Sequence, residues 1–212
     1  MRAMARRGEE LRTHILYAAK AVFLEHGFER ASMDQVAAHA QTSKRTLYAH
    51  FESKEALYLA IVDYVRSVTL ERLQTPADYP GPPLEALAQF LARFMQATLH
   101  GPAIQMARMS IGIASRFPDG AAEYFDVAFQ GVTAHLVAHL RGALRLSPRT
   151  AQDAANALLG RILVPRFLRA LFAVDPLPPA VPLPPDAPPP SPADLHLARE
   201  LVTEIVKPLL KA

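Results

Sequence analysis

The stretch AQTSKRTLYAHFESK, residues 40–54, concentrates polar and basic side chains in a chain whose residues are 50% hydrophobic. From Thr42 onward, its side chains are expected to bury almost nothing apart from Leu47 and Phe51. Hydroxyl, imidazole and cationic groups in this density favour a partner that accepts hydrogen bonds and carries negative charge. The residues concerned are Thr42, Ser43, Lys44, Arg45, Thr46, Tyr48 and His50.

The positive charge of the chain is confined to the same region. Residues 1–50 contain eight Lys or Arg and five Asp or Glu, whereas residues 51–212 contain fifteen of each. The whole net charge of +3 therefore lies in the quarter of the chain that contains this stretch. Charge alone leaves two interpretations open, a solvated helix face and a surface for nucleic acid.

The apolar residues recur at helical spacing around this stretch and predict three short elements. A helix over 9–26 is stopped by Gly27, and Ser32 opens a second helix with Gln35 three residues on, which is the pattern of a capping box. Ser43 is the expected N-cap of a third helix, and Ser53 that of a fourth, which runs to about Leu73.

Two short helices joined by a tight turn and backed by a longer helix describe a helix-turn-helix. Ala37, Ala40, Leu47 and Phe51 supply the inward residues, which leaves the polar side of the third helix outward. Lys44 and Arg45 at its start can reach base edges, and arginine pairs bidentately with guanine. Tyr48 and His50 offer hydrogen bonds to phosphate oxygens, and Lys54 adds a charge.

Residues 11–60, and above all the tracts FLEHGFERASMDQVA and SKRTLYAHFESKEAL, resemble the N-terminal domain of the TetR family of bacterial transcriptional regulators. The resemblance implies that Lys44, Arg45 and Thr46 face the major groove. It implies that phosphates are held by the backbone N–H of Met33 and by Ser32, Tyr48, His50 and Lys54, to which we add Ser43. The family usually has Gly-Val where this chain has Gln41-Thr42, and a positive φ at Gln41 would cost about 1 kcal/mol.

Beyond the breaker-rich segment TPADYPGPP (75–83), the periodicity predicts five longer helices, at about 83–99, 103–116, 119–146, 149–173 and 192–210. Pro165 should kink the fourth of these. Ten of the nineteen prolines lie in 175–192 and predict an extended connector. We therefore expect an all-α fold of about nine helices. It comprises a helix-turn-helix head (1–54), a connecting helix (54–74) and a larger helical domain (75–212) for effector binding and dimerisation.

The last two predicted helices are too apolar for a single buried face, which indicates burial against a second chain as well. The family resemblance implies that these helices pair across a two-fold axis, so we expect a homodimer and a near-palindromic double-stranded DNA operator. The interface candidates are Leu158, Ile162, Leu168, Phe172, Leu201, Ile205 and Leu209.

The middle helices of the larger domain carry methionine and phenylalanine side chains that fit two interpretations, ordinary core packing and an apolar effector pocket. The tract QMARMSIGIASRFPDGAAEYFDVAFQGV also resembles, more loosely, the AefR-like subgroup. We expect a small apolar or aromatic effector there. The pocket candidates are Phe90, Phe94, Met95, Gln105, Arg108, Met109, Phe125 and Phe129.

Several other classes of protein are disfavoured. The chain has no cysteine and lacks a triad, paired carboxylates or a phosphate loop, so we expect no enzyme activity and no cofactor. His135 and His139 have metal-ligand spacing but no third ligand, and a solvated face is the favoured interpretation. Two alternatives stay open: a helical small-molecule binder or enzyme with an unused head, and a DNA-coating protein without sequence preference.

The sequence also predicts a soluble, cytoplasmic protein. The opening MRAMARRGEELR is basic, but Glu9 and Glu10 stand where the apolar part of a signal peptide would begin. The most apolar later segment is interrupted by Arg161, Arg166 and Arg169. A membrane-spanning helix needs about 20 mostly apolar residues.

Overall fold

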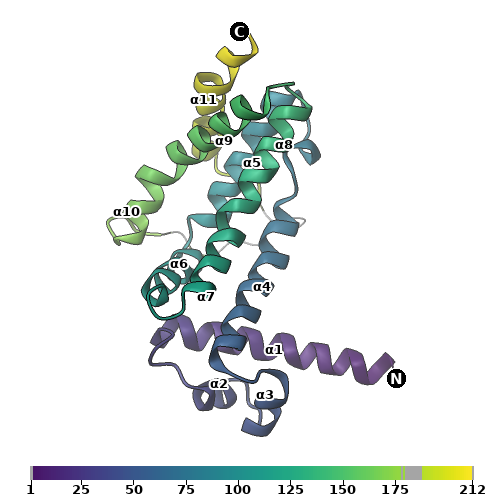
Figure 1. Cartoon of the computed structure of the whole chain (residues 1–212), viewed down its shortest axis with the longest axis vertical. Helices are drawn as coiled ribbons and strands as arrows, with labels where there is room; N and C mark the ends of the chain where they lie inside the picture. Colours follow the sequence, from purple (N-terminus) through teal and green to yellow (C-terminus); the bar gives the residue numbers. More distant parts are fainter. Residues whose placement is uncertain (1, 178, 180–187, 212) are drawn as a thin grey trace. The chain divides into compact units, whose positions relative to one another are not determined.

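The computed structural model describes residues 2–177, 179 and 188–211, and within these residues every regular element is helical. The chain divides into two compact units, and Figure 1 labels the helices from which they are built. The first comprises Met1–Arg66 and Met106–Phe125, and the second comprises Ser67–Gln105 and Asp126–Ala212. The all-α class predicted from the sequence is confirmed.

The first unit is built on a long helix that packs on two short ones. Its elements are α1 (Arg2–His26), α2 (Met33–His39), α3 (Lys44–His50), the first part of α4 (Lys54–Leu73), the second part of α6 (Gly101–Ile113) and α7 (Pro118–Phe125). The helix α1 begins earlier than the predicted residue 9. The fully buried side chains of this unit come from each of its first four helices: Ile15, Ala19, Phe23, Val36, Leu47, Leu57, Tyr58, Ile61 and Val62.

The turn between α2 and α3 lies at Gln41-Thr42, where the sequence predicts a turn. Gln41 adopts a φ of 49°, the left-handed conformation that the family usually gives to glycine. The N–H of Gln41 donates to the carbonyl of Ala38 (3.1 Å), and the N–H of Thr42 donates to that of Ala37 (3.0 Å). This pair of bonds is a Schellman motif, which satisfies the last carbonyls of α2 and turns the chain into α3.

Segment 106–125 packs into the first unit through buried polar and aromatic contacts. The hydroxyls of Tyr58 and Ser110 are hydrogen-bonded at 2.6 Å, and the rings of Phe28 and Phe117 are stacked with centroids 6.4 Å apart. A Cβ at Gly120 would collide with the Phe117 ring. Burial raises the pKa of the Tyr58 phenol above its ordinary value, and the Ser110 hydrogen bond offsets part of this rise. The two compact units therefore do not divide at residues 75–83, where the sequence predicts a domain boundary. The functions predicted for the two domains stay predictions.

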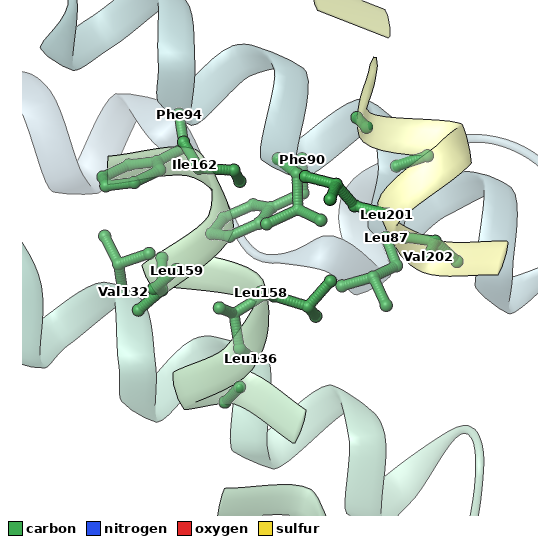
Figure 2. Close-up of a cluster of buried hydrophobic side chains, with 14 of the residues drawn as sticks. Leu87, Phe90, Phe94, Val132, Leu136, Leu158, Leu159, Ile162, Leu201 and Val202 are labelled. Carbon is green, nitrogen blue, oxygen red and sulfur yellow. The ribbon is translucent and has the colours of Figure 1, made fainter. Parts of the chain in front are cut away.

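The second unit has one contiguous apolar core, between α5 (Pro83–Thr98), α8 (Gly131–Gly142), α9 (Pro148–Ile162) and α11 (Pro192–Leu201). Figure 2 shows side chains from all four helices converging on it. Each fully buried leucine or phenylalanine contributes about 1.5–3 kcal/mol of transfer free energy. The labelled members are Leu87, Phe90, Phe94, Val132, Leu136, Leu158, Leu159, Ile162, Leu201 and Val202.

Three helices predicted to be continuous each contain a π-helical turn. These turns span Asp126–Gln130 before α8, Leu163–Phe167 between α9 and α10 (Leu168–Leu171), and Val202–Val206 after α11. The second surrounds Pro165, which has no N–H to donate, so the predicted irregularity there takes the form of a wider turn. Counted through their π turns, the helices of the described chain number nine, as predicted. Short 3-10 turns lie at Pro76–Asp78 and Lys207–Leu210.

Half of the proline-rich segment predicted to be an extended connector, residues 178 and 180–187, lies outside the described residues. Its flanks are anchored to the second unit. Arg169 forms a bidentate ion pair with Asp175, with both N–O distances 2.7 Å. On the other flank, the carbonyl of Pro188 accepts a hydrogen bond of 2.6 Å from the Arg93 guanidinium.

Replacing Gln41 by glycine should stabilise the protein. Gly adopts positive φ freely, so the variant is relieved of a backbone strain of about 1 kcal/mol. The greater conformational freedom of glycine in the unfolded chain offsets roughly a few tenths of a kcal/mol of this gain. We expect Gln41→Gly to raise the free energy of unfolding in urea by about 0.5–1 kcal/mol. Gln105→Gly is the matched control, because the exposed Gln105 is inside α6, where glycine should instead cost about 1 kcal/mol. Equal effects of the two substitutions would contradict this account of the turn.

Candidate nucleic-acid interface

The outward face of α3 carries the side chains that the sequence assigns to base recognition. Leu47 is fully buried, which fixes the rotation of the helix about its axis and turns Lys44, Arg45 and Tyr48 outward. Tyr48 is 50% exposed. Thr46, in contrast, is half-buried, and its hydroxyl contacts the Ser43 Oγ at 2.8 Å.

Ser43 caps α3, as predicted. Its Oγ accepts a hydrogen bond of 3.0 Å from the backbone N–H of Thr46. Lys44, the first residue of the helix, places its Nζ 2.6 Å from a carboxylate oxygen of Asp34 on α2. Both side chains are largely exposed, and such surface pairs contribute about 0–1 kcal/mol, so a phosphate or a base can displace Asp34 at little cost.

Four of the six predicted phosphate contacts line one hollow of about 580 Å³ on the first unit. Ser32 and Met33 reach it from the start of α2, Tyr48 from α3 and Lys54 from the start of α4. Ser43 and His50 do not line it. The hollow also contains the carboxylates of Asp34, Glu52 and Glu55, which are not among the residues predicted for the interface. Glu52 and Glu55 flank Ser53 and Lys54 in the sequence.

The start of α2 is held by a capping box, as predicted. Ser32 Oγ accepts from the N–H of Gln35 (3.2 Å), and the Gln35 side chain accepts from the N–H of Ser32 (2.8 Å). Met33 is the first residue of the helix, and the N–H groups of a first turn have no partner within the helix. Its side chain is buried, so only its backbone is placed to meet a ligand.

Lys54 is the one predicted phosphate contact whose cationic group is already engaged inside the protein. Its Nζ donates to the carbonyls of Phe28 (2.7 Å), Glu29 (3.2 Å) and Ala31 (3.1 Å). The same Nζ lies 4.5 Å from the centre of the Phe28 ring. The ammonium therefore points toward the loop between α1 and α2.

The predicted effector-pocket residues lie in different environments. Phe90 and Phe94 are core side chains, Phe129 is half-buried against the same core, and Phe125 is 52% exposed. Gln105 and Arg108 are both exposed, and Gln105 belongs to the second unit while Arg108 belongs to the first. The remaining candidates, Met95 and Met109, are buried and line two separate pockets.

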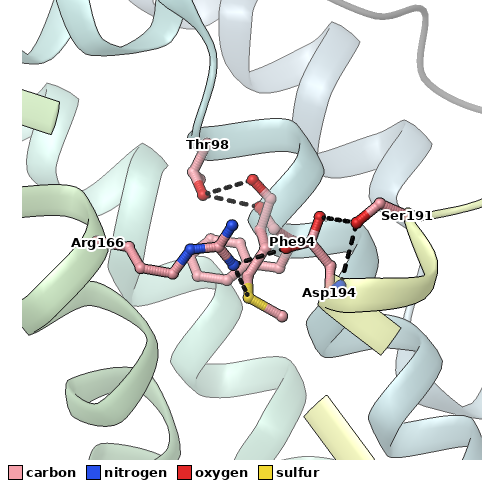
Figure 3. A network of polar contacts seen from close by, with 6 residues as sticks. Phe94, Thr98, Arg166, Ser191 and Asp194 are labelled. Atoms are coloured by element: carbon pink, nitrogen blue, oxygen red, sulfur yellow. Dashed lines mark hydrogen bonds and ion pairs between the residues drawn. The ribbon is translucent and has the colours of Figure 1, made fainter. Parts of the chain in front are cut away.

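The Met95 pocket lies in the second unit and has a volume of about 380 Å³. Figure 3 shows the polar network on its wall, in which Arg166 lies 2.6 Å from an Asp194 carboxylate oxygen and 3.1 Å from the Met95 sulfur. Ser191 caps α11 by accepting from the Asp194 N–H. The Met109 pocket, of about 270 Å³, lies in the first unit beside the loop 26–30.

The predicted interface residues divide into buried and exposed groups. Leu158, Ile162 and Leu201 are buried in the core of their own unit, so the prediction that they meet a second chain is wrong. The apolar helices need that many side chains for their own packing. Leu168 and Phe172 are 45% and 79% exposed, and Ile205 and Leu209 are half-buried. Val164, Val174 and Leu210 are also exposed.

His135 and His139 do not form a solvated face, contrary to the favoured interpretation. His139 is buried, with its Nε2 3.0 Å from the carbonyl of Pro83, and the Nδ1 of His135 is buried. Among the described residues there is no group of three or more potential metal ligands. Within the same residues, every helix is too short or too polar to cross a membrane.

Two family models match this arrangement. Residues 15–61 match the model for bacterial regulatory proteins of the TetR family, and residues 85–182 match the C-terminal domain of AefR-like transcriptional repressors. The chain belongs to the TetR family. The first match covers α2, α3 and the turn between them, which carry the candidate interface of this TetR-family protein.

Two curated relatives of this TetR-family protein are similar to it over about a third of its length. The transcriptional activator FasR of Mycolicibacterium smegmatis is 42% identical over 74 residues, which are 33% of this chain and 34% of FasR. The transcriptional regulator UidR of Escherichia coli is 40% identical over 75 residues, 35% of this chain and 38% of UidR. The matched stretch thus spans little more than a third of these relatives.

Solved structures share the fold over nearly the whole chain. GusR of Salmonella enterica has a TM-score of 0.65 at 22% identity, covering 93% of this chain and 96% of GusR. The flavonoid-responsive regulator FrrA has a TM-score of 0.68 at 24% identity, covering 92% of this chain and 94% of FrrA. At these identities the likeness shows a common fold.

Removing the cap of α2 should weaken the head. We expect Ser32→Ala to lower the free energy of unfolding by about 1 kcal/mol, because an orphan N–H of the first turn loses its acceptor. Ser115→Ala, at an exposed position, is the control and should change it by less than about 0.5 kcal/mol. Urea denaturation measures both. A loss at Ser32 no larger than that at Ser115 would mean that the capping box contributes nothing.

Proposed function

We propose that this TetR-family protein is a sequence-specific DNA-binding transcriptional regulator that acts in the bacterial cytoplasm. The observation that carries the proposal is the juxtaposition, within one compact unit, of the exposed Lys44, Arg45 and Tyr48 with the hollow at the start of α2. A short helix with a polar and basic outer face fits the major groove. The hollow beside it is the place that we propose for phosphates of the DNA backbone.

Within this proposal the side chains divide by task. Lys44, Arg45 and Thr46 face the bases, and Arg45 is suited to guanine because its fork matches the O6 and N7 acceptors. The phosphates are held by the N–H of Met33 and by hydroxyl or imidazole groups of Ser32, Ser43, Tyr48 and His50. Lys54 is left out of the phosphate set because carbonyls of the loop already hold its ammonium.

The proposed regulator binds as a homodimer through the exposed apolar residues that follow α9. Val164, Leu168 and Phe172 recur at helical spacing across the π turn and α10, and all three are exposed. Isolated surface apolar residues are common, but a row of them along one helix marks an interaction surface. Ile205, Leu209 and Leu210 extend the proposed surface on the last helix. A two-fold dimer presents two heads and requires a near-palindromic operator.

The proposed regulation is release of a repressor from its operator by a small apolar or aromatic effector. The Met95 pocket supports binding of a small molecule in the second unit, because its wall combines apolar side chains with a few polar groups. Release requires that the effector bind the DNA-incompetent state more tightly, and allosteric couplings of this kind are typically about 1–3 kcal/mol.

Selection of fragmented genomic DNA by the purified protein tests the DNA-binding proposal. We expect one enriched near-palindrome, bound at least roughly 10³-fold more tightly than random DNA. Arg45→Ala should lose about 1–3 kcal/mol on that site and accept other bases at one position of each half-site. Binding without enrichment that merely weakens with salt would favour the DNA-coating alternative instead.

A charge placed in the proposed dimer surface should separate the protomers. We expect Phe172→Glu to convert the dimer into a monomer at micromolar concentration, because pairing would bury an unpaired carboxylate. Ile111→Glu is the matched control: Ile111 is 63% exposed, compared with 79% for Phe172, but lies on α6 of the first unit. Sedimentation velocity measures both. A Phe172→Glu variant that remains dimeric would exclude this surface.

A further inference from the structure

We infer that Lys54 is a positioning residue for DNA binding, which holds the loop 28–31 through its backbone carbonyls and so fixes the entry to α2. The inference rests on the proposed function, since it concerns how the head is arranged for the same DNA. It replaces the direct phosphate contact that the family resemblance implies for Lys54.

The first support is the saturation of the ammonium. A lysine ammonium has three N–H donors, and three loop carbonyls lie 2.7–3.2 Å from the Nζ of Lys54. The face of the Phe28 ring supplies a further attraction at 4.5 Å. A phosphate contact by Lys54 would require giving up one or more of these bonds.

The second support is that Lys54 is the side chain that engages the backbone carbonyls of the loop. The carbonyls of Glu29 and Ala31 are outside any helix, and within the loop 28–31 the Ala31 N–H donates a backbone bond to the carbonyl of Gly27 (3.1 Å). The Arg30 side chain donates to the carbonyl of His26 (3.1 Å) and the Glu29 side chain pairs with Arg116, but neither of these contacts engages a carbonyl of the loop. Ser32 follows directly, so a shift of the Ala31 carbonyl displaces the capping box and the first N–H of α2. A single cation on α4 thereby sets the position of groups on a different helix.

The third support is the identity of the residue that the ammonium touches. Phe28 is buried and also contacts the rings of Phe23, Tyr58 and Phe117. The Phe28 side chain is therefore held by aromatic packing, whereas the loop carbonyls are held by Lys54. Neither restraint alone fixes both the ring and the carbonyls.

The salt dependence of operator binding separates positioning from contact. Each phosphate neutralised by a cation contributes about 0.9 to the slope of log K against log salt. For Lys54→Met we expect binding to the selected operator to weaken about tenfold at every salt concentration, with the slope unchanged. A slope smaller by about 0.9 would assign Lys54 to a phosphate and overturn the inference. Arg45→Met, on the exposed face of α3, calibrates the loss of one interfacial cation.

Two further variants sharpen the comparison. Phe28→Leu alters a buried ring that cannot meet DNA, and it should weaken binding in the same direction without changing the slope. Lys54→Arg keeps the charge but replaces the compact ammonium with a planar fork, which cannot reproduce the three-carbonyl geometry. We expect incomplete rescue by arginine, whereas a phosphate contact would be fully restored by it.

Hydrogen exchange in the free protein tests the anchoring without DNA. In Lys54→Met, amides 29–35 should exchange at least roughly tenfold faster, while amides of the α1 core keep their protection. Unchanged exchange at 29–35 would overturn the inference even if the operator is confirmed. Accelerated exchange together with no operator would instead sink the proposed function and leave the anchoring of the loop established.

Discussion

The burial of Leu47 is the constraint on which the candidate interface depends. The helix α3 has only seven residues, too few to be stable alone, so its position comes from what it packs against. With Leu47 and the following Phe51 in the core, the helix has a single permitted rotation. That rotation presents Lys44, Arg45 and Tyr48 together. The recognition face is thus a by-product of core packing, and residues that never meet a ligand decide which residues do.

The same logic governs the helices of the second unit, where burial limits what is left for partners. The helix α5 supplies Leu87, Phe90 and Phe94 to the core, and α9 supplies Leu158 and Ile162. Side chains committed to this core cannot also bind a second chain or an effector. The exposed apolar side chains of Val164, Leu168 and Phe172 remain available to a partner, and they lie in and after the π turn at Pro165, which shifts the helical register. Beyond that turn, Leu168 and Phe172 point outward even though they continue the apolar pattern of the sequence.

Much of the head could be predicted from the sequence because its signals are local. A capping serine, a glutamine three residues later and a tight turn each act within one helical turn of the residue that reveals them. The capping box at Ser32 and the position of the turn at Gln41-Thr42 were predictable for this reason. The engagement of Lys54 was not, because its partners are more than twenty residues away in the chain. Similarly, the apolar stripe of α9 predicted burial, but periodicity cannot distinguish a helix's own core from a partner's surface.

The charge distribution indicates where the specificity of such a head must originate. Residues 8–50 contain five basic and five acidic residues, so the net charge of residues 1–50 comes from Arg2, Arg6 and Arg7 alone. On the packed part of the head, Lys44 faces Asp34 and Lys54 faces carbonyls, and the hollow holds three carboxylates. Cations compensated in this way add little unspecific attraction to a polyanion. A head of this kind gains its preference from hydrogen bonds of fixed geometry, and this makes the exact placement of the α2 entry matter more than the number of positive charges beside it.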